Sequence, residues 1–216
     1  SYLAYLAEHN LLVPILLQLC TGLRLECIMV DVLHAADLGL TAGIIGNILW
    51  ETVVKRNWGA SNQESNVALL AKDLALLYKT TQCKVRLQGA LTKERIRPDG
   101  KFPKLKAKGA AARYLAYYAL YVAKRFSTGI IHDQFKVALC GNLVRFYQIM
   151  AENGKFFAPP VQREFAQVGQ NLSRIISILS AEAHALKGRL WKYAPKVQPI
   201  EHMTAEQAAS CHVLNR

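Results

Sequence analysis

Apolar residues recur at helical spacing along most of the chain, which predicts a mainly helical protein. In the clearest case, apolar side chains repeat every three or four residues between Ile44 and Val53 and so form one face of a helix. Thr41 is expected to cap that helix, because a threonine hydroxyl at this position can accept a bond from a free backbone amide. Helices are predicted over residues 42–56, 65–79, 105–126, 133–151 and 161–186.

Two short segments have strand character instead. Residues 24–30 contain β-branched side chains near their end, which favour extended backbone, and residues 191–197 form a second candidate. Pro98-Asp99-Gly100 predicts a turn, because proline presets φ and glycine permits a positive φ. We therefore expect one mainly α, bundle-like domain over residues 1–216, with one or two short strands.

The composition points to a partner that carries negative charge. The formal net charge is +12 and the sequence pI is about 9.6, a balance that favours nucleic acid as the partner. The five cysteines are scattered and odd in number. They argue against a disulfide framework or a cysteine zinc site and favour a reducing compartment, either the nucleus or the cytoplasm. No apolar run reaches the roughly 18 residues of a membrane helix, so we expect no membrane partner.

Most of the excess positive charge is concentrated between Lys84 and Arg113, where only Glu94 and Asp99 oppose it. Basic side chains in such a segment bind phosphates without reading the base sequence. A flexible, solvated loop would have the same composition. The candidate nucleic-acid-binding residues are Lys93, Arg95, Arg97, Lys101, Lys104, Lys106, Lys108 and Arg113.

Four tyrosines follow the basic segment on the predicted helix of residues 105–126. They recur at intervals of three and four residues and so share one helix face. A stripe of this kind packs into a core more often than it stacks on nucleic-acid bases, and we expect these rings in the core. The stripe consists of Tyr114, Tyr117, Tyr118 and Tyr121.

A second candidate site lies where Asp31 and His34 follow the predicted strand of residues 24–30. The run Asp31-Val32-Leu33-His34-Ala35-Ala36-Asp37-Leu38-Gly39 leads directly into the predicted helix of residues 42–56. This run resembles the Asp-x-x-His-x-x-x-Leu-Gly signature of eukaryotic DDE transposases of the cut-and-paste type, such as the CACTA-like groups. The resemblance implies an RNase H-like protein that cuts and joins DNA with carboxylate-held Mg²⁺.

The resemblance also implies roles for single residues. Asp31 would be a catalytic residue and a metal ligand, and His34 would assist proton transfer or position DNA. Asp37 is a candidate for a helix cap or for a ligand. Residues 102–115 and 190–203 resemble later segments of the family. The first has alanine where an acid is expected, and the second keeps only one of two histidines.

Taken with the charge, the resemblance predicts the DNA-binding portion of a longer transposase-like protein, with the fold of its helical insertion. The chain would be at most a fragment of the enzyme, since the family's last catalytic acid is expected beyond Arg216. We expect DNA as the partner, a possible homo-oligomer and no small-molecule cofactor. Two alternatives stay open, namely a non-enzymatic helical module that binds nucleic acid or protein, and a small RNA-binding domain.

Overall fold

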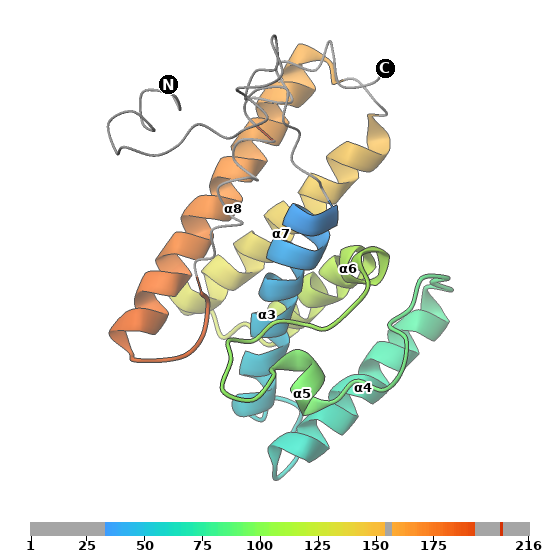
Figure 1. The fold of residues 1–216 in the computed structure, drawn as a ribbon, viewed down its shortest axis with the longest axis vertical. Helices are drawn as coiled ribbons and strands as arrows, with labels where there is room; N and C mark the ends of the chain where they lie inside the picture. The colour runs from blue at the N-terminus through green and yellow to red at the C-terminus, as the bar shows by residue number, and fades with distance from the viewer. Residues whose placement is uncertain (1–32, 154–156, 193–203, 205–216) are drawn as a thin grey trace, which may run out of the picture. The chain divides into compact units, whose positions relative to one another are not determined.

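The computed structural model of the chain describes residues 33–153, 157–192 and 204. All of them belong to the second of two units, Asp31–Arg216. Every regular element formed by these residues is helical, which confirms the mainly α prediction (Figure 1). The elements are η2 (Leu33–Thr41, a π-helix), α3 (Ala42–Val54), α4 (Gln63–Thr80), α5 (Lys93–Ile96), α6 (Gly109–Arg125), α7 (Ile131–Glu152) and α8 (Pro159–Ala185).

Helix α3 is buried on nearly all sides, because its sequence is apolar around the whole circumference. It contacts η2, α4, α5 and α6. The chain is already helical before Ala42, so the first turn of α3 needs no side-chain cap. Thr41 makes no capping bond, and its predicted role is therefore wrong. Its hydroxyl is instead hydrogen-bonded to the hydroxyl of Tyr147 at 2.7 Å.

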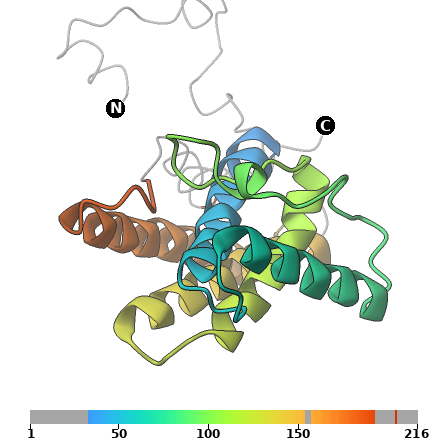
Figure 2. The ribbon, with the colours of Figure 1, turned by 90° about the horizontal axis from the view of Figure 1, so that it is seen from below.

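The remaining core lies between α6, α7 and α8, which pack against one another in sequence order (Figure 1 and Figure 2). Phe146 of α7 is buried and stacks on Phe165 of α8, with ring centroids 5.0 Å apart. Leu143 of α7 and Leu172 of α8 are also fully buried. Burial of apolar faces at helical spacing accounts for this part of the fold.

Most predicted helix boundaries are confirmed to within two residues, but the helix predicted over residues 105–126 begins only at Gly109. The backbone just before Gly109 is extended, because its amides bond to other segments. Lys104 N donates to Ile96 O, and Leu105 N donates to Ala42 O, both at 2.9 Å. These bonds take Leu105 away from helical geometry.

Other local predictions have mixed outcomes. The turn at residues 98–100 is confirmed, with Lys101 N donating to Pro98 O at 3.1 Å and Gly100 at a φ of +65°. The strand predicted over residues 24–30 lies outside the described residues. Trp191 and Lys192 are described and are not part of a strand, while residues 193–197 lie outside the described part. No helix that the structure describes is long and apolar enough to cross a membrane.

The tyrosine stripe of α6 is mostly exposed, which corrects the expectation that it packs into the core. Only Tyr118 is fully buried, because it lies on the same line of the helix as the core residue Leu115. Tyr114, Tyr117 and Tyr121 lie beside that line and are 50%, 45% and 42% exposed.

The backbone of the segment before α6 touches α3 at Gly46. A Cβ on Gly46 would lie 2.6 Å from Lys104 N and 2.8 Å from Leu105 N. Real Cβ atoms essentially never approach backbone atoms so closely. Gly46 thus permits a contact that no other residue type allows, whereas Gly43, one turn earlier, would have nothing within 4 Å of its Cβ.

This contrast gives a matched pair of glycine substitutions. Gly46→Ala is expected to lower the free energy of unfolding by about 1–3 kcal/mol, because the overpacked segment must move. Gly43→Ala is expected to raise it by roughly 0.5–1 kcal/mol, since alanine favours the helix. Urea denaturation of both variants measures the difference. Equal effects of the two substitutions would contradict the close contact at Gly46.

Candidate nucleic-acid interface

The catalytic residues implied by the Asp-x-x-His motif fall at the edge of what the structure describes. Asp31 lies outside the described residues. The backbone of His34 belongs to η2, but its side chain also lies outside the described part. Gly39, at the end of the motif, lies within η2 just before α3.

Asp37, the second acid of the motif, is a buried structural anchor. Its carboxylate accepts a bond from the Tyr147 hydroxyl at 2.6 Å and pairs with the guanidinium of Arg113 at 2.9 Å. These contacts tie η2 to α7 and α6. Asp37 is therefore neither the helix cap nor the open ligand that the sequence left as alternatives.

The described residues do not form the Mg²⁺ site that the family resemblance implies. Within them, no group of three or more histidine, cysteine or acidic side chains is placed to hold a metal ion. Asp37 is occupied by Arg113 and Tyr147. The Mg²⁺ prediction therefore depends on Asp31, which lies outside the described residues.

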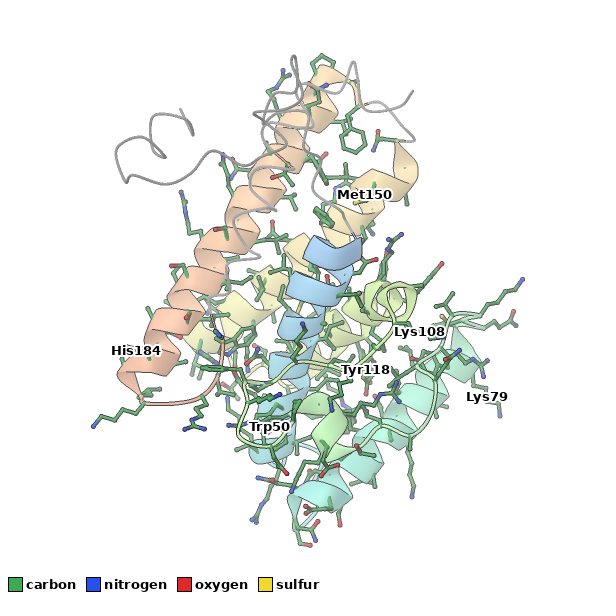
Figure 3. All side chains as sticks on the ribbon, in the orientation of Figure 1. Trp50, Lys79, Lys108, Tyr118, Met150 and His184 are labelled. Carbon is green, nitrogen blue, oxygen red and sulfur yellow. The ribbon has the colours of Figure 1, made fainter. Side chains whose placement is uncertain are left out.

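The extended segment Pro103–Lys108 forms a ridge of lysines beside the motif. Pro103 and Leu105 are buried, whereas Lys104, Lys106 and Lys108 are exposed. Side chains of an extended chain alternate between two faces, so the apolar residues anchor the segment and the lysines point outward. We call this segment the lysine ridge; Figure 3 shows Lys108 next to the start of α6.

A pocket of about 920 Å³ is lined by residues of both the lysine ridge and the motif. Its lining includes Leu38 and Gly39 of the motif together with Lys101, Lys104 and Lys106. We call it the motif pocket. The fold thus brings the end of the motif, Leu38 and Gly39, close to the basic segment, although more than sixty residues separate Gly39 from Lys101.

A second pocket, of about 660 Å³, also borders the lysine ridge. Basic residues dominate its lining, and none of its described lining residues is acidic. We call it the basic pocket. Its basic lining residues are Lys84, Arg86, Arg95, Lys106 and Lys108.

The N-terminal turn of α6 contributes to the basic pocket through Ala110 and Ala111. Lys108, the residue that precedes the helix, makes no capping bond, and the first turn holds no acidic residue. The first amides of a helix carry partial positive charge. They therefore add to the positive potential that the lysines and arginines create.

Several of the predicted binding residues have partners inside the protein. Lys93 donates to Glu64 at 2.9 Å, and the guanidinium of Arg97 lies 5.1 Å from the centre of the Trp50 ring. Arg95 donates to three backbone carbonyls, among them Lys106 O at 2.7 Å. Arg113 pairs with Asp37. The charges of these four residues are therefore partly used within the protein, and their main role is to hold the surrounding segments in place.

The sequence held a signal for the lysine ridge that the helical interpretation overlooked. Polar and small or apolar residues alternate strictly from Pro103 to Lys108, and this period of two is typical of a strand. Lys84 and Arg86 follow the same alternation and are both exposed. Neither was among the predicted binding residues, and both line the basic pocket.

A second polar cluster, centred on Glu51 of α3, was not predicted. Its buried carboxylate accepts bonds from Lys136 Nζ at 2.9 Å and from the Trp191 indole at 2.5 Å, and it lies 3.1 Å from His132 Nε2. Burial raises the pKa of Glu51. The hydrogen bonds and charges of His132 and Lys136 more than reverse that effect and lower the pKa to about 2.

His132 links three helices through this cluster. Its Nδ1 lies 2.8 Å from Glu182 of α8, while Nε2 faces Glu51 of α3. The hydrogen bond with Glu51 raises the pKa of His132, burial lowers it, and the bond with Glu182 raises it further, so that the net shift is upward. Because both ring nitrogens are engaged, His132 is a structural link and is poorly suited to act as a general base.

No protein-family model matches the chain, no curated protein matches it, and no solved structure matches it. A function therefore has to follow from the side chains themselves.

Proposed function

We propose that the chain binds DNA through the lysine ridge and the basic pocket, as the DNA-binding portion of a transposase-like protein. The observation that carries this proposal is the lining of the basic pocket, which joins five basic side chains to an uncapped helix N-terminus. Phosphate groups are the ligands that such a lining favours.

The spacing of the lysine ridge fits a phosphate backbone. Alternate residues of an extended chain lie roughly 6.6 Å apart, so Lys104, Lys106 and Lys108 form a row of about 13 Å. Phosphates recur along one DNA strand with an axial rise of about 3.4 Å. Because the strand also winds around the axis, successive phosphates lie further apart than this rise, and a row of about 13 Å is long enough to contact at least two of them.

The transposase-like part of the proposal is supported by the neighbourhood of the motif. Leu38 and Gly39 share the motif pocket with Lys101 and Lys104. DNA held on the lysine ridge would therefore pass beside the segment that resembles the family signature. Cleavage and strand transfer would belong to the longer protein and would need acids beyond those that the structure describes.

The proposal predicts how DNA affinity responds to salt when two ridge lysines are neutralised. Each phosphate contact contributes about one unit to the slope of log affinity against log salt. The double variant Lys106→Gln/Lys108→Gln is therefore expected to weaken binding and to reduce that slope by about two. Fluorescence anisotropy of a labelled duplex, recorded over a series of salt concentrations, measures both quantities.

The matched control is Arg163→Gln/Arg174→Gln, which removes the same charge from exposed positions on α8. Neither arginine lines the motif pocket or the basic pocket. If both double variants lowered the slope equally, binding would depend on net charge alone. If the unaltered chain showed no salt-dependent affinity for DNA, the function would have to be sought in a protein-interaction module.

A further inference from the structure

The solvent face of α6 carries an unusual set of side chains. Its exposed positions hold only alanine, basic residues and tyrosine, and the helix contains no acidic residue. Removing an aromatic ring from water is favourable, so rings as exposed as those of Tyr114 and Tyr117 offer surface that a ligand could cover. The exposed residues are Ala110, Arg113, Tyr114, Tyr117, Tyr121, Lys124 and Arg125.

The three exposed rings follow one another along the helix axis. With a rise of about 1.5 Å per residue, Tyr117 lies roughly 4.5 Å beyond Tyr114, and Tyr121 lies roughly 6 Å further on. These intervals are close to the separation of successive bases in a stretched single strand. The hydroxyls of Tyr114 and Tyr117 make no hydrogen bond with any residue that the structure describes.

The last ring of the stripe is held in place. Arg125 donates to the Tyr121 hydroxyl at 2.9 Å and pairs with Asp73 of α4 at 2.8 Å. The ring of Tyr121 also stacks on the buried Tyr118, with centroids 6.0 Å apart. A ring that is already oriented loses little side-chain entropy when a base stacks on it.

The stripe begins at the edge of the basic pocket. Ala110 lines that pocket, and Tyr114 lies one helical turn further along the same face. Lys108 lies at the start of the helix (Figure 3), and Lys124 lies in its last turn, beside the Arg125 that pairs with Asp73. Positive charge therefore stands at both ends of the row of rings, which suits a negatively charged, base-bearing ligand.

We infer that this face binds single-stranded DNA, with phosphates in the basic pocket and bases stacked on Tyr114, Tyr117 and Tyr121. This inference rests on the proposed function and names the form of DNA that the site selects. In a duplex the bases are already stacked on one another, so their faces cannot meet the rings. Unpaired bases present those faces, and aromatic side chains bind them with little sequence preference.

The test uses the whole chain and three labelled probes of equal length, about twelve nucleotides. The probes are an unstructured single strand, a duplex, and a single strand whose central sugars lack bases. For the double variant Tyr114→Ala/Tyr117→Ala we expect single-strand affinity to fall by tenfold or more, roughly the effect of losing one or two stacked bases. Duplex affinity should change by less than about twofold, because phosphate contacts remain.

Two controls separate stacking from a loss of structure. Tyr114→Phe/Tyr117→Phe keeps the rings and should bind the single strand as the unaltered chain does. The probe that lacks bases should bind the unaltered chain at least as weakly as the intact single strand binds the alanine variant, because that variant keeps Tyr121. Circular dichroism should show full helicity for both variants, because both positions are exposed and alanine favours a helix.

Two negative results would have different meanings. If the unaltered chain bound none of the probes, the proposed function and this inference would both fall. If it bound DNA but the alanine variant kept its full affinity for the single strand, DNA binding would stand and the stacking face would be refuted. Loss of duplex and single-strand affinity in equal measure would also refute it.

Discussion

Glu51→Ala is expected to lower the free energy of unfolding by about 3 kcal/mol, within the range for breaking a buried ion pair. The change removes the acceptor of the Trp191 indole and one of the two carboxylates near the buried Lys136 ammonium. It also frees one nitrogen of His132. Urea denaturation, with the slope of the transition checked for constancy, measures the loss.

Glu152→Ala provides the comparison, because Glu152 also pairs with a cation but does so on the surface. Its carboxylate lies 3.0 Å from Arg145, and its side chain is 56% exposed. Exposed pairs contribute at most about 1 kcal/mol, so this variant should unfold near the original concentration of urea. Glu51→Gln should fall between the two, since an amide oxygen can still accept the Trp191 bond. Equal losses for Glu51→Ala and Glu152→Ala would contradict a buried cluster.

Stability is expected to be highest between about pH 4.5 and pH 6.5 and to decline on both sides. The pKa of Glu51 falls from its usual 4.5 to about 2 in the folded chain. Its contribution is therefore complete above pH 4.5 and is lost as the pH falls toward 2. A shift of this size corresponds to about 3 kcal/mol. Asp133, whose pKa is lowered as well, adds to the acid arm.

The alkaline arm comes from His132. Its folded pKa lies above the usual 6.5, so its contribution is complete below pH 6.5 and is lost as the pH rises through the folded value. Urea midpoints recorded across this range give the profile. Glu51→Gln should flatten much of the acid arm, and His132→Gln should flatten the alkaline arm. An acid arm that is unchanged in Glu51→Gln would show that other carboxylates dominate it.

The long helices could be predicted from the sequence because their signal is local. In α7, for example, Leu139, Leu143 and Phe146 recur at core spacing, and the helix ends close to the predicted residue. The last four residues of the lysine ridge, 105–108, were predicted to be helical, because lysine, leucine and alanine all favour a helix. The bonds that hold the ridge extended come from Ala42, Arg95 and Ile96, which lie far enough away that local propensity cannot report them.

The interior polar contacts could not be predicted for a related reason. His132 and Lys136 lie 81 and 85 residues from Glu51, so only the packing of α7 against α3 reveals their pairing. The sequence did contain one indication of this cluster. Glu51 is a charged residue within the apolar helix 42–54, and a buried carboxylate needs a partner. For the tyrosine stripe, a four-residue face was too wide to be buried whole, and only Tyr118 reached the core.

The close contact at Gly46 also bears on the thermodynamics of ligand capture. Many basic segments that bind polyanions are disordered in the free protein and lose conformational entropy when they fold on binding. Here the backbone of Lys104 and Leu105 already packs against α3. Gly46 has no Cβ and so permits this contact, and the hydrogen bond from Leu105 N to Ala42 O holds it in place. The ridge is thus preorganised, and a polyanion that docks on it need not supply the free energy of folding the segment. Docking should then proceed with a small change in heat capacity, as expected for charges that meet a surface already in place.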